Sequence, residues 1–363
     1  MGEEGTYASG AELCGETIAG QTPPLKGVDH MTKNAEQHTA EEKGSWVTWR
    51  PGIKVLDCSI RDGGLMNDHR FEDGLVRELY QTCAAAGIDY MELGYKASKR
   101  IFAPDAFGAW KYCDEDDIRR IVGDKPANVK LSVMADAERT DYHEDILPAA
   151  DSVLDMVRVA TYIHQIPTAI DMIQDAHQKG YETTVNLMAI SVVQDNDLDD
   201  ALEALGETDV GTIYLVDSFG ALYSEEIQAL ARKYLAITEA TGKQLGIHCH
   251  NNQQLAFANT IEAIVLGANR LDATVAGLGR GAGNCPLELL IGFLKNPNYQ
   301  LRPILQFIDE HVVQLRETMR WGYEIPYMIT GQLNQHPREA IRLLESDEPG
   351  ALVEFFDTMV EQV

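Results

Sequence analysis

Gly246-Ile-His-Cys-His-Asn-Asn252 is the stretch on which the predicted fold depends. It continues a short apolar run, so we predict a β-strand that ends at His248 and His250. Side chains two residues apart in a strand point to the same face, which lets the two imidazoles converge on one point. A metal ion suits such a pair. A solvated strand end or a satisfied pair of core histidines would give the same pattern, so the rest of the chain has to decide.

Apolar runs of similar length recur along the chain and alternate with amphipathic stretches. We predict helices at 73–86, 168–179, 197–205, 224–241 and 253–266, because acidic or Ser starts and Gly stops are typical of helix ends. The eight predicted strands are 53–56, 90–93, 129–134, 156–159, 183–188, 212–216, 244–247 and 270–274.

Repeated strand–helix units imply parallel strands, because a parallel connection needs a crossover. Eight units over about 240 residues predict an α/β fold, the (β/α)₈ TIM barrel. A doubly wound sheet is the alternative, and it usually carries a glycine-rich phosphate loop after its first strand. Here that place reads Arg61-Asp-Gly-Gly64, which lacks the GxGxxG spacing.

The segments that flank the predicted barrel differ from it in pattern. Residues 1–45 have few large apolar side chains, so we predict a disordered tail or an arm that orders on a neighbouring subunit. The barrel is then assigned to 46–298. Residues 299–363 lose the strand rhythm and predict a helical C-terminal extension, with helices at 304–320, 338–344 and 351–361.

Composition excludes several classes of function. The 363 residues include 57 acidic and 30 basic side chains, a net charge of −27 that makes nucleic acid an unsuitable partner. No apolar run approaches a membrane span, so we expect no membrane association. Six scattered cysteines without a CxxC pair indicate reduced thiols and a cytoplasmic protein.

In a TIM barrel, active-site groups follow the carboxyl ends of the strands. The polar residues expected at those ends converge from most of the predicted strands. They are Arg61, Asp62, Glu92, Arg158, Asn186, Asp217, His248, His250 and, in the glycine-rich loop after the last strand, Asn284.

Four of these stretches resemble one known family. Leu56-Asp-Cys-Ser-Ile-Arg-Asp-Gly-Gly64, Met91-Glu-Leu-Gly94, the His-x-His strand end and Val275–Glu288 are similar to motifs of the pyruvate-carboxyltransferase-like, or HMG-CoA lyase-like, metalloenzymes. That family includes 4-hydroxy-2-oxovalerate aldolase, HMG-CoA lyase and the isopropylmalate and homocitrate synthases. The glycine-rich loop and the lack of a large regulatory domain favour the aldolases.

The resemblance implies a divalent metal held by Asp62, His248 and His250, with Asn284 as a further ligand or neighbour. Such a donor set suits Mg²⁺ or Mn²⁺, with Co²⁺ or Zn²⁺ as alternatives. The metal would act as a Lewis acid on a ketone oxygen, with Arg61 as a second positive contact. A salt bridge from Arg61 to Glu92 or Asp217 is the structural alternative.

The remaining candidates would bind substrate or move a proton. We assign Glu92, Arg158, Asn186, Asp217 and Arg280 to substrate binding. The aldolases carry a histidine soon after Arg-Asp-Gly, where this chain has Gly64-Leu65, and His69 further on is interpreted as a solvated loop residue. The candidates for proton transfer are Tyr95, His164, Tyr323 and a metal-bound water, with Tyr323 first because its Gly-Tyr segment resembles one after the aldolase barrel.

We therefore predict a divalent-metal-dependent aldolase, a carbon–carbon lyase that acts on a 2-oxo acid through a pyruvate-like enolate. One alternative is a Claisen-type synthase that joins an acyl-CoA to a 2-oxo acid. Another is an inactive barrel that serves as a partner subunit. The expected partners are a small 2-oxo acid and an aldehyde, further copies of the chain in a homo-oligomer and, by resemblance, a partner dehydrogenase.

Overall fold

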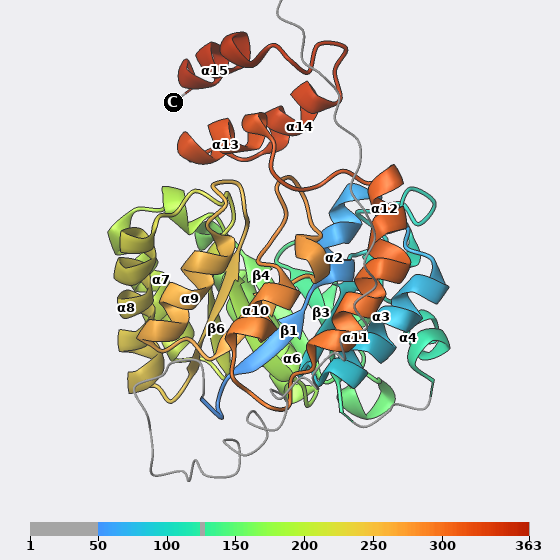
Figure 1. Cartoon of the computed structure of the whole chain (residues 1–363). Coiled ribbons are helices and arrows are strands. Elements are labelled where there is room, and N and C mark those ends of the chain that lie inside the picture. The colour runs from blue at the N-terminus through green and yellow to red at the C-terminus, as the bar shows by residue number, and fades with distance from the viewer. Residues whose placement is uncertain (1–49, 124–127, 363) are drawn as a thin grey trace, which may run out of the picture. The chain divides into compact units, whose positions relative to one another are not determined.

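The computed structural model describes residues 50–123 and 128–362 and contains a closed barrel of eight parallel strands (Figure 1). Each strand pairs with the next along the chain, and the last pairs with the first. The predicted TIM barrel is confirmed. The strands are β1 (Lys54–Asp57), β2 (Tyr90–Tyr95), β3 (Lys130–Asp136), β4 (Met156–Thr161), β5 (Glu182–Leu187), β6 (Thr212–Asp217), β7 (Gln244–Cys249) and β8 (Arg270–Ala273).

The strands are buried on both faces, which explains why they read as nearly continuous apolar runs in the sequence. Every residue of β2, β4 and β6 is buried. One large apolar cluster fills the space between the barrel and its surrounding helices. The barrel is thus a packed support that holds the side chains at its two ends in place.

Helices follow or connect the strands around the outside. The predicted limits of the helix at 73–86 are confirmed, and Gly87 ends it in the left-handed conformation with φ 73°. The α-helices of this part are α2 (Ser59–Gly63), α3 (Asp73–Ala86), α4 (Glu115–Val122), α5 (Tyr142–Asp145), α6 (Ile166–Gln178), α7 (Asp195–Gly206), α8 (Ser224–Ala240), α9 (Ala256–Leu266) and α10 (Leu287–Phe293). Single 3₁₀ turns are η1 (Gly64–Met66), η2 (Ala109–Lys111), η3 (Ala149–Asp151), η4 (Ile163–Gln165), η5 (Ile190–Val192) and η6 (Val275–Gly277).

The C-terminal helices form two groups. The helix predicted at 304–320 is divided into α11 (Leu301–Phe307), a π-helical segment η7 (Ile308–Val312) and α12 (Val313–Thr318). Beyond it lie α13 (Ile325–Gln332), α14 (Arg338–Leu344) and α15 (Leu352–Val360). Sequence reasoning missed α13, a short helix whose first turn contains Pro326.

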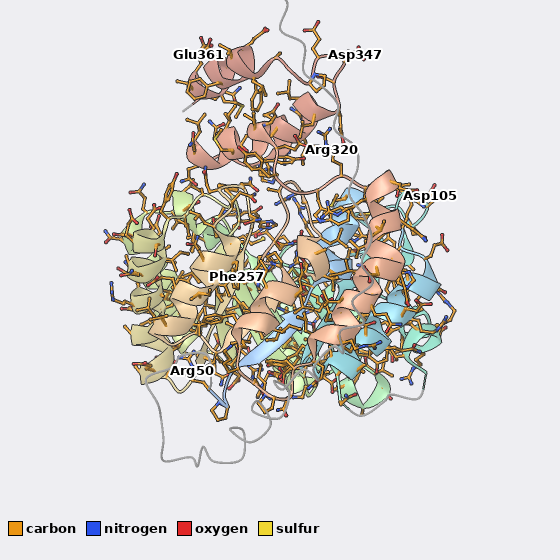
Figure 2. All side chains as sticks on the ribbon, in the orientation of Figure 1. Arg50, Asp105, Phe257, Arg320, Asp347 and Glu361 are labelled. Carbon is orange, nitrogen blue, oxygen red and sulfur yellow. The ribbon has the colours of Figure 1, made fainter. Side chains whose placement is uncertain are left out.

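The second group packs over the carboxyl ends of the strands (Figure 1). The side-chain amide of Asn334 donates to the carbonyl of Ser191 after β5 at 2.9 Å, and Gln253 after β7 donates to the carbonyl of Met328 at 3.1 Å. Figure 2 places Arg50, before β1, and Arg320, after α12, at opposite ends of the barrel. The extension therefore covers the end of the barrel at which the polar side chains were predicted to gather.

Two sequence predictions are not tested by these features. Residues 1–45, predicted as a tail or arm, lie outside the described residues, and the domain limits at 45 and 298 stay predictions.

Among the described residues, no helix combines the length and apolarity needed to cross a membrane.

Candidate active site

Arg61 and Asp62 lie on α2, a single helical turn that begins two residues after β1 ends. Both are buried, with 5% and 0% of their surface exposed. The sequence predicted their place at the strand end but not the helix. Because the turn follows the strand so closely, both side chains are fixed by backbone that is itself packed on the barrel.

Asp62 forms one cluster with His248 in β7 and His250 directly after it. The Nε2 atoms of His248 and His250 each lie 3.9 Å from Oδ2 of Asp62, and the three candidate ligand atoms lie within 4.8 Å of one another. All three residues are buried. The same-face geometry expected for His-x-His brings the imidazoles together, and the carboxylate of Asp62 adds a third candidate donor.

His248 is oriented by Asp272, a residue that was not predicted from the sequence. Its Nδ1 lies 3.0 Å from Oδ2 of Asp272 in β8, and the same oxygen lies 2.5 Å from Nη2 of Arg158. A carboxylate at Nδ1 favours the tautomer with the proton there, which leaves the Nε2 lone pair facing Asp62. Such a partner is typical of a histidine that binds metal.

Asn284 contributes an unused oxygen to the same cluster. It pairs by an isolated β-bridge with His250, and its Nδ2 donates to the carbonyl of Leu278 at 3.2 Å. Its Oδ1 is buried and has no hydrogen-bond donor among the described residues. Gly279 makes this approach feasible, because a Cβ there would lie 2.6 Å from Oδ1 of Asp62 and closer still to the amide of Asn284. The residues present fit a bound divalent ion: a carboxylate, two imidazoles and an orphaned amide oxygen.

The electrostatics of the cluster keep its donors available. Burial alone would raise the pKa of Asp62, but the nearby Arg61 and His250 outweigh it and hold that pKa well below its usual value. Burial lowers the pKa of His250 to about 3, against the opposing effect of Asp62. At neutral pH the carboxylate is ionised and the His250 imidazole is neutral, which are the forms that bind a metal.

Arg61 forms the salt bridge that the sequence offered as a structural alternative, and it also reaches the site. Its Nε donates to Oε2 of Glu92 at 2.7 Å, and its Nη1 donates to Oδ2 of Asp62 at 2.7 Å. The salt bridge to Glu92 is therefore present. Arg61 also lines a cavity of about 200 Å³ at the carboxyl ends of the strands, so its guanidinium is fixed beside any small molecule bound there.

That cavity brings together six of the predicted site residues: Arg61, Asp62, Asn186, His248, His250 and Arg280. The backbone N–H of Arg280 donates to Oδ1 of Asp62 at 3.1 Å. The Oδ1 atom of Asn186 is buried and has no donor among the described residues. These contacts leave both residues available for a ligand.

Three residues assigned to substrate binding do not line the cavity. Glu92 and Arg158 lie in the middle of their strands, inside the barrel, and form an ion pair at 3.1 Å. Asp217 instead accepts the backbone N–H groups of Ala221 and Leu222 at 3.0 and 3.4 Å, which stabilises the turn after β6. We correct these three assignments to structural roles.

Tyr323 is also corrected, because 56% of its surface is exposed and it does not line the cavity. Trp321, two residues earlier, is buried instead, and its indole donates to the carbonyl of Ala276 at 3.0 Å. The extension contributes His336 to the cavity wall instead, from the loop between α13 and α14. That loop has no pattern from which the contact could have been predicted.

His69 is buried rather than solvated, with 2% of its surface exposed. Its ring fills the space that a side chain at Gly64 would need, and it meets Tyr95 edge-on with 5.3 Å between ring centroids. Burial, with the positive charge of Lys111, lowers its pKa to about 3. The structure does not place it in the cavity wall. His164, another proton-transfer candidate, stacks on Tyr162 and is also outside the wall.

Among the further titratable residues in the cavity wall are three that come from a strand end or a nearby loop. Tyr95 ends β2, Asp136 ends β3, and Lys111 ends η2. Burial is the largest effect on each: it raises the pKa of Tyr95 and of Asp136, and it lowers the pKa of Lys111. Only Tyr95 was among the sequence candidates. The signal for Asp136 was its place after an apolar run, whereas Lys111 lies in a loop without one.

The chain thus combines a TIM barrel with a buried Asp-His-His cluster that could hold a metal ion beside a small cavity. Residues 52–311 match the family described as HMGL-like. The chain belongs to this family, and the resemblance seen in the sequence is confirmed.

Individual relatives agree with the family. An oxaloacetate decarboxylase from Mycobacterium tuberculosis is 31% identical over 246 residues, which cover 66% of this chain and 69% of that protein. A 4-hydroxy-2-oxovalerate aldolase from Bacillus cereus is 28% identical over 253 residues, 69% of this chain and 71% of that protein.

Among solved structures, the N-terminal domain of a putative aldolase from Bacteroides vulgatus is 26% identical with a TM-score of 0.74, and the match covers 86% of this chain and 100% of that one. Hydroxymethylglutaryl-CoA lyase from Pseudomonas aeruginosa, 17% identical with a TM-score of 0.61 over 75% of this chain and 95% of that one, shares the fold. Together with the family, these relatives make the chain an enzyme of the lyase and aldolase class.

Proposed function

We propose that this enzyme is a divalent-metal-dependent carbon–carbon lyase that cleaves a 2-oxo acid and releases pyruvate. The observation that carries the proposal is the cluster of Asp62, His248 and His250 facing a cavity beside the guanidinium of Arg61. Relatives named as an aldolase and a decarboxylase of 2-oxo acids support it. Both reactions break the bond between C3 and C4 of a 2-oxo acid and leave the enolate of pyruvate.

Asp62, His248 and His250 would hold the ion, with Oδ1 of Asn284 as a further donor. This mixed set of oxygen and nitrogen donors favours Mg²⁺ or Mn²⁺, with Co²⁺ or Zn²⁺ as alternatives. When bound, the ion would supply Lewis-acid polarisation of the ketone of the substrate.

Cleavage of a 4-hydroxy-2-oxo acid needs no oxidant or reductant. The bond between C3 and C4 breaks, and its electron pair moves toward the C2 ketone oxygen as the enolate of pyruvate. The C4 hydroxyl loses its proton as the aldehyde forms, and C3 gains a proton to give pyruvate. Arg61 is held by Glu92 and Asp62, so its positive charge is already in place when negative charge develops on the ketone oxygen.

Two cavity residues suit the two proton transfers. Tyr95 lines the cavity as a protonated phenol that would deliver a proton to C3, and its raised pKa favours recovery of that proton afterwards. Burial also raises the pKa of Asp136, which makes that carboxyl a better acceptor for the C4 hydroxyl proton. Tyr95 thus takes the role that the sequence gave first to Tyr323.

The test is exchange of the methyl protons of pyruvate in heavy water, followed by proton NMR on the metal-loaded full chain. We expect metal-dependent loss of the methyl signal. The rate should fall by roughly two orders of magnitude or more in Arg61→Ala, the scale of losing one oxyanion donor. Tyr95→Phe should slow exchange with the metal content unchanged.

Matched controls come from outside the cavity. Arg120 pairs with Asp73 and Asp117 on the surface, and Tyr323 is exposed. Arg120→Ala and Tyr323→Phe should exchange at the wild-type rate. Absence of exchange in the wild type, with thiol release from acetyl-CoA and a 2-oxo acid, would assign the enzyme to the Claisen-type synthases instead. If neither activity is found, the result favours the inactive-barrel alternative.

A further inference from the structure

Lys111 carries a buried positive charge that the chain itself does not neutralise. It lies in the loop between β2 and α4, lines the cavity and has only 7% of its surface exposed. In the described part of the chain, no hydrogen-bond acceptor or carboxylate pairs with its Nζ. Asp136, in the same wall, opposes the lowering of the Lys111 pKa by burial but forms no ion pair with it among the described residues.

Aromatic rings hold the ammonium group in place. Nζ lies 4.3 Å from the ring centroid of Phe102, 4.6 Å from that of Tyr95 and 5.5 Å from that of Phe107. Faces of aromatic rings stabilise a cation, but they replace only part of the hydration that burial removes. The ammonium group is therefore packed among aromatic rings and lacks, within the described chain, an anionic partner on the side that faces the cavity.

The surrounding charges point the same way. Arg139, after β3, also lines the cavity and forms no ion pair with any described residue. Arg61 differs, because Glu92 and Asp62 already compensate its charge. The wall thus adds Arg139, an exposed cation without an ion pair in the described chain, to the buried ammonium group of Lys111, and Asp136 acts on both. In a chain of net charge −27, this local excess of positive charge needs a reason.

We propose that Lys111, supported by Arg139, binds a second carboxylate of the substrate, so that the enzyme acts on 4-hydroxy-2-oxo diacids. The inference rests on the proposed function, in which the 2-oxo end of the substrate lies at the Asp62 cluster. The second carboxylate would sit beyond the C3–C4 bond and leave with the aldehyde fragment. Lys111 is then a binding residue that selects the substrate, and the bond-breaking charge is left to Arg61.

The kinetic experiment compares two substrates that differ only in this group. 4-Hydroxy-2-oxoglutarate carries a carboxylate where 4-hydroxy-2-oxovalerate carries a methyl group, and both release pyruvate. We expect the wild type to favour the diacid at least tenfold in kcat/KM. Lys111→Met, which keeps an unbranched side chain against the aromatic rings, should reduce this ratio about tenfold or more, because a charge-assisted contact is lost.

A binding experiment reads the same preference without turnover. Calorimetric titration of the metal-loaded protein with 2-oxoglutarate and with 2-oxovalerate compares a carboxylate with a methyl group at the same carbon. The diacid should bind about tenfold tighter or more to the wild type, and Lys111→Met should remove the difference. Lys111→Arg, which keeps the charge, should retain it. Melting temperatures of both variants verify that the fold is intact.

The matched control is Lys99→Met. Lys99 lies in the same loop, over the ring of Tyr112, but it pairs with Asp114 at 2.5 Å and is not in the cavity wall. This variant should keep the wild-type preference.

The outcomes separate the two proposals. The carboxylate subsite is refuted, and the lyase retained, if the enzyme exchanges pyruvate protons but prefers neither diacid. The same holds if a preference for the diacids survives in Lys111→Met. A Lys111-dependent preference in binding, without exchange or cleavage, retains the subsite and refutes the lyase.

Discussion

Two polar networks of the barrel, one around Glu182 at the amino end of the strands and one at their carboxyl end, satisfy their members to different degrees. At the amino end of the strands, the hydroxyl of Tyr90 donates to Glu182 at 2.9 Å, and Arg270 contacts Glu182, Tyr90 and Gln244 at 3.1, 2.9 and 2.5 Å. None of these four residues keeps a buried polar atom without a partner. At the carboxyl end, one buried polar atom without a partner remains on each of Asn186, Asn284 and Arg280.

This difference shows what each polar group is for. A network whose members satisfy one another stabilises the fold and has nothing left to bind. A network with oriented but unused donors and acceptors is less stable than it could be, and a ligand can complete it. We expect mutations at the amino end to change stability and mutations at the carboxyl end to change binding.

The largest expected effect is the loss of metal from His248→Ala. Removing a ligand should exceed the roughly 10–100-fold loss of affinity that follows the removal of an outer partner of a ligand. Elemental analysis should find close to one divalent ion per wild-type chain and little in the variant. Equal metal contents in the two proteins would refute the site.

Glu182→Ala tests the opposite end. It leaves Arg270 and the hydroxyl of Tyr90 without their shared acceptor, so we expect the free energy of unfolding to fall by about 1–3 kcal/mol. Urea unfolding measures the loss. Metal content and pyruvate exchange should stay at wild-type values, and a large decrease in either would show that the two ends are not independent.

The smallest effect concerns Asp217. It lies at the carboxyl end of the strands, but both oxygens of its carboxylate accept hydrogen bonds, as the groups of the amino-end network do. Burial raises its pKa to about 7, against backbone hydrogen bonds that lower it. Its usual pKa in the unfolded chain is 3.8, so the folded state binds more protons between about pH 4 and pH 7. Its contribution to stability is therefore complete below pH 4 and is lost as the pH rises toward 7.

Asp217→Asn removes this proton and should flatten the dependence. Between pH 5 and pH 6 the wild type should lose about 1.4 kcal/mol more than the variant, as one pH unit allows. Urea midpoints at the two pH values give the comparison. A variant that loses as much as the wild type would show that Asp217 is ionised throughout.

The barrel could be predicted because its evidence is periodic and local. Eight apolar runs mark eight strands, and a strand buried on both faces leaves little freedom in where it begins and ends. Helices α2 and α13 escaped prediction because they are too short to show a period, and α13 contains Pro326. Their existence depends on contacts with the barrel.

The metal cluster was proposed from strand ends, but depth within the barrel was not readable. Glu92 and Arg158 are third in their strands and lie inside the barrel, whereas Asn186 is fifth in β5 and reaches the cavity. The predicted strands 90–93 and 156–159 end two residues before the observed ones, so the sequence placed Glu92 and Arg158 too close to the strand ends. Lys111 and His336 come from loops, whose approach to the cavity depends on the whole fold.

The positive cavity wall has a consequence for how substrate arrives. A dianion that approaches this protein first meets the field of 57 acidic side chains, and only at the mouth does it meet Lys111 and Arg139. Salt screens the outer field within about 8 Å at physiological ionic strength, but it screens buried groups much less. Moderate salt therefore lowers the long-range repulsion more than the short-range attraction. Capture of the substrate should accelerate as salt is added, the reverse of the behaviour of an enzyme with a cationic surface.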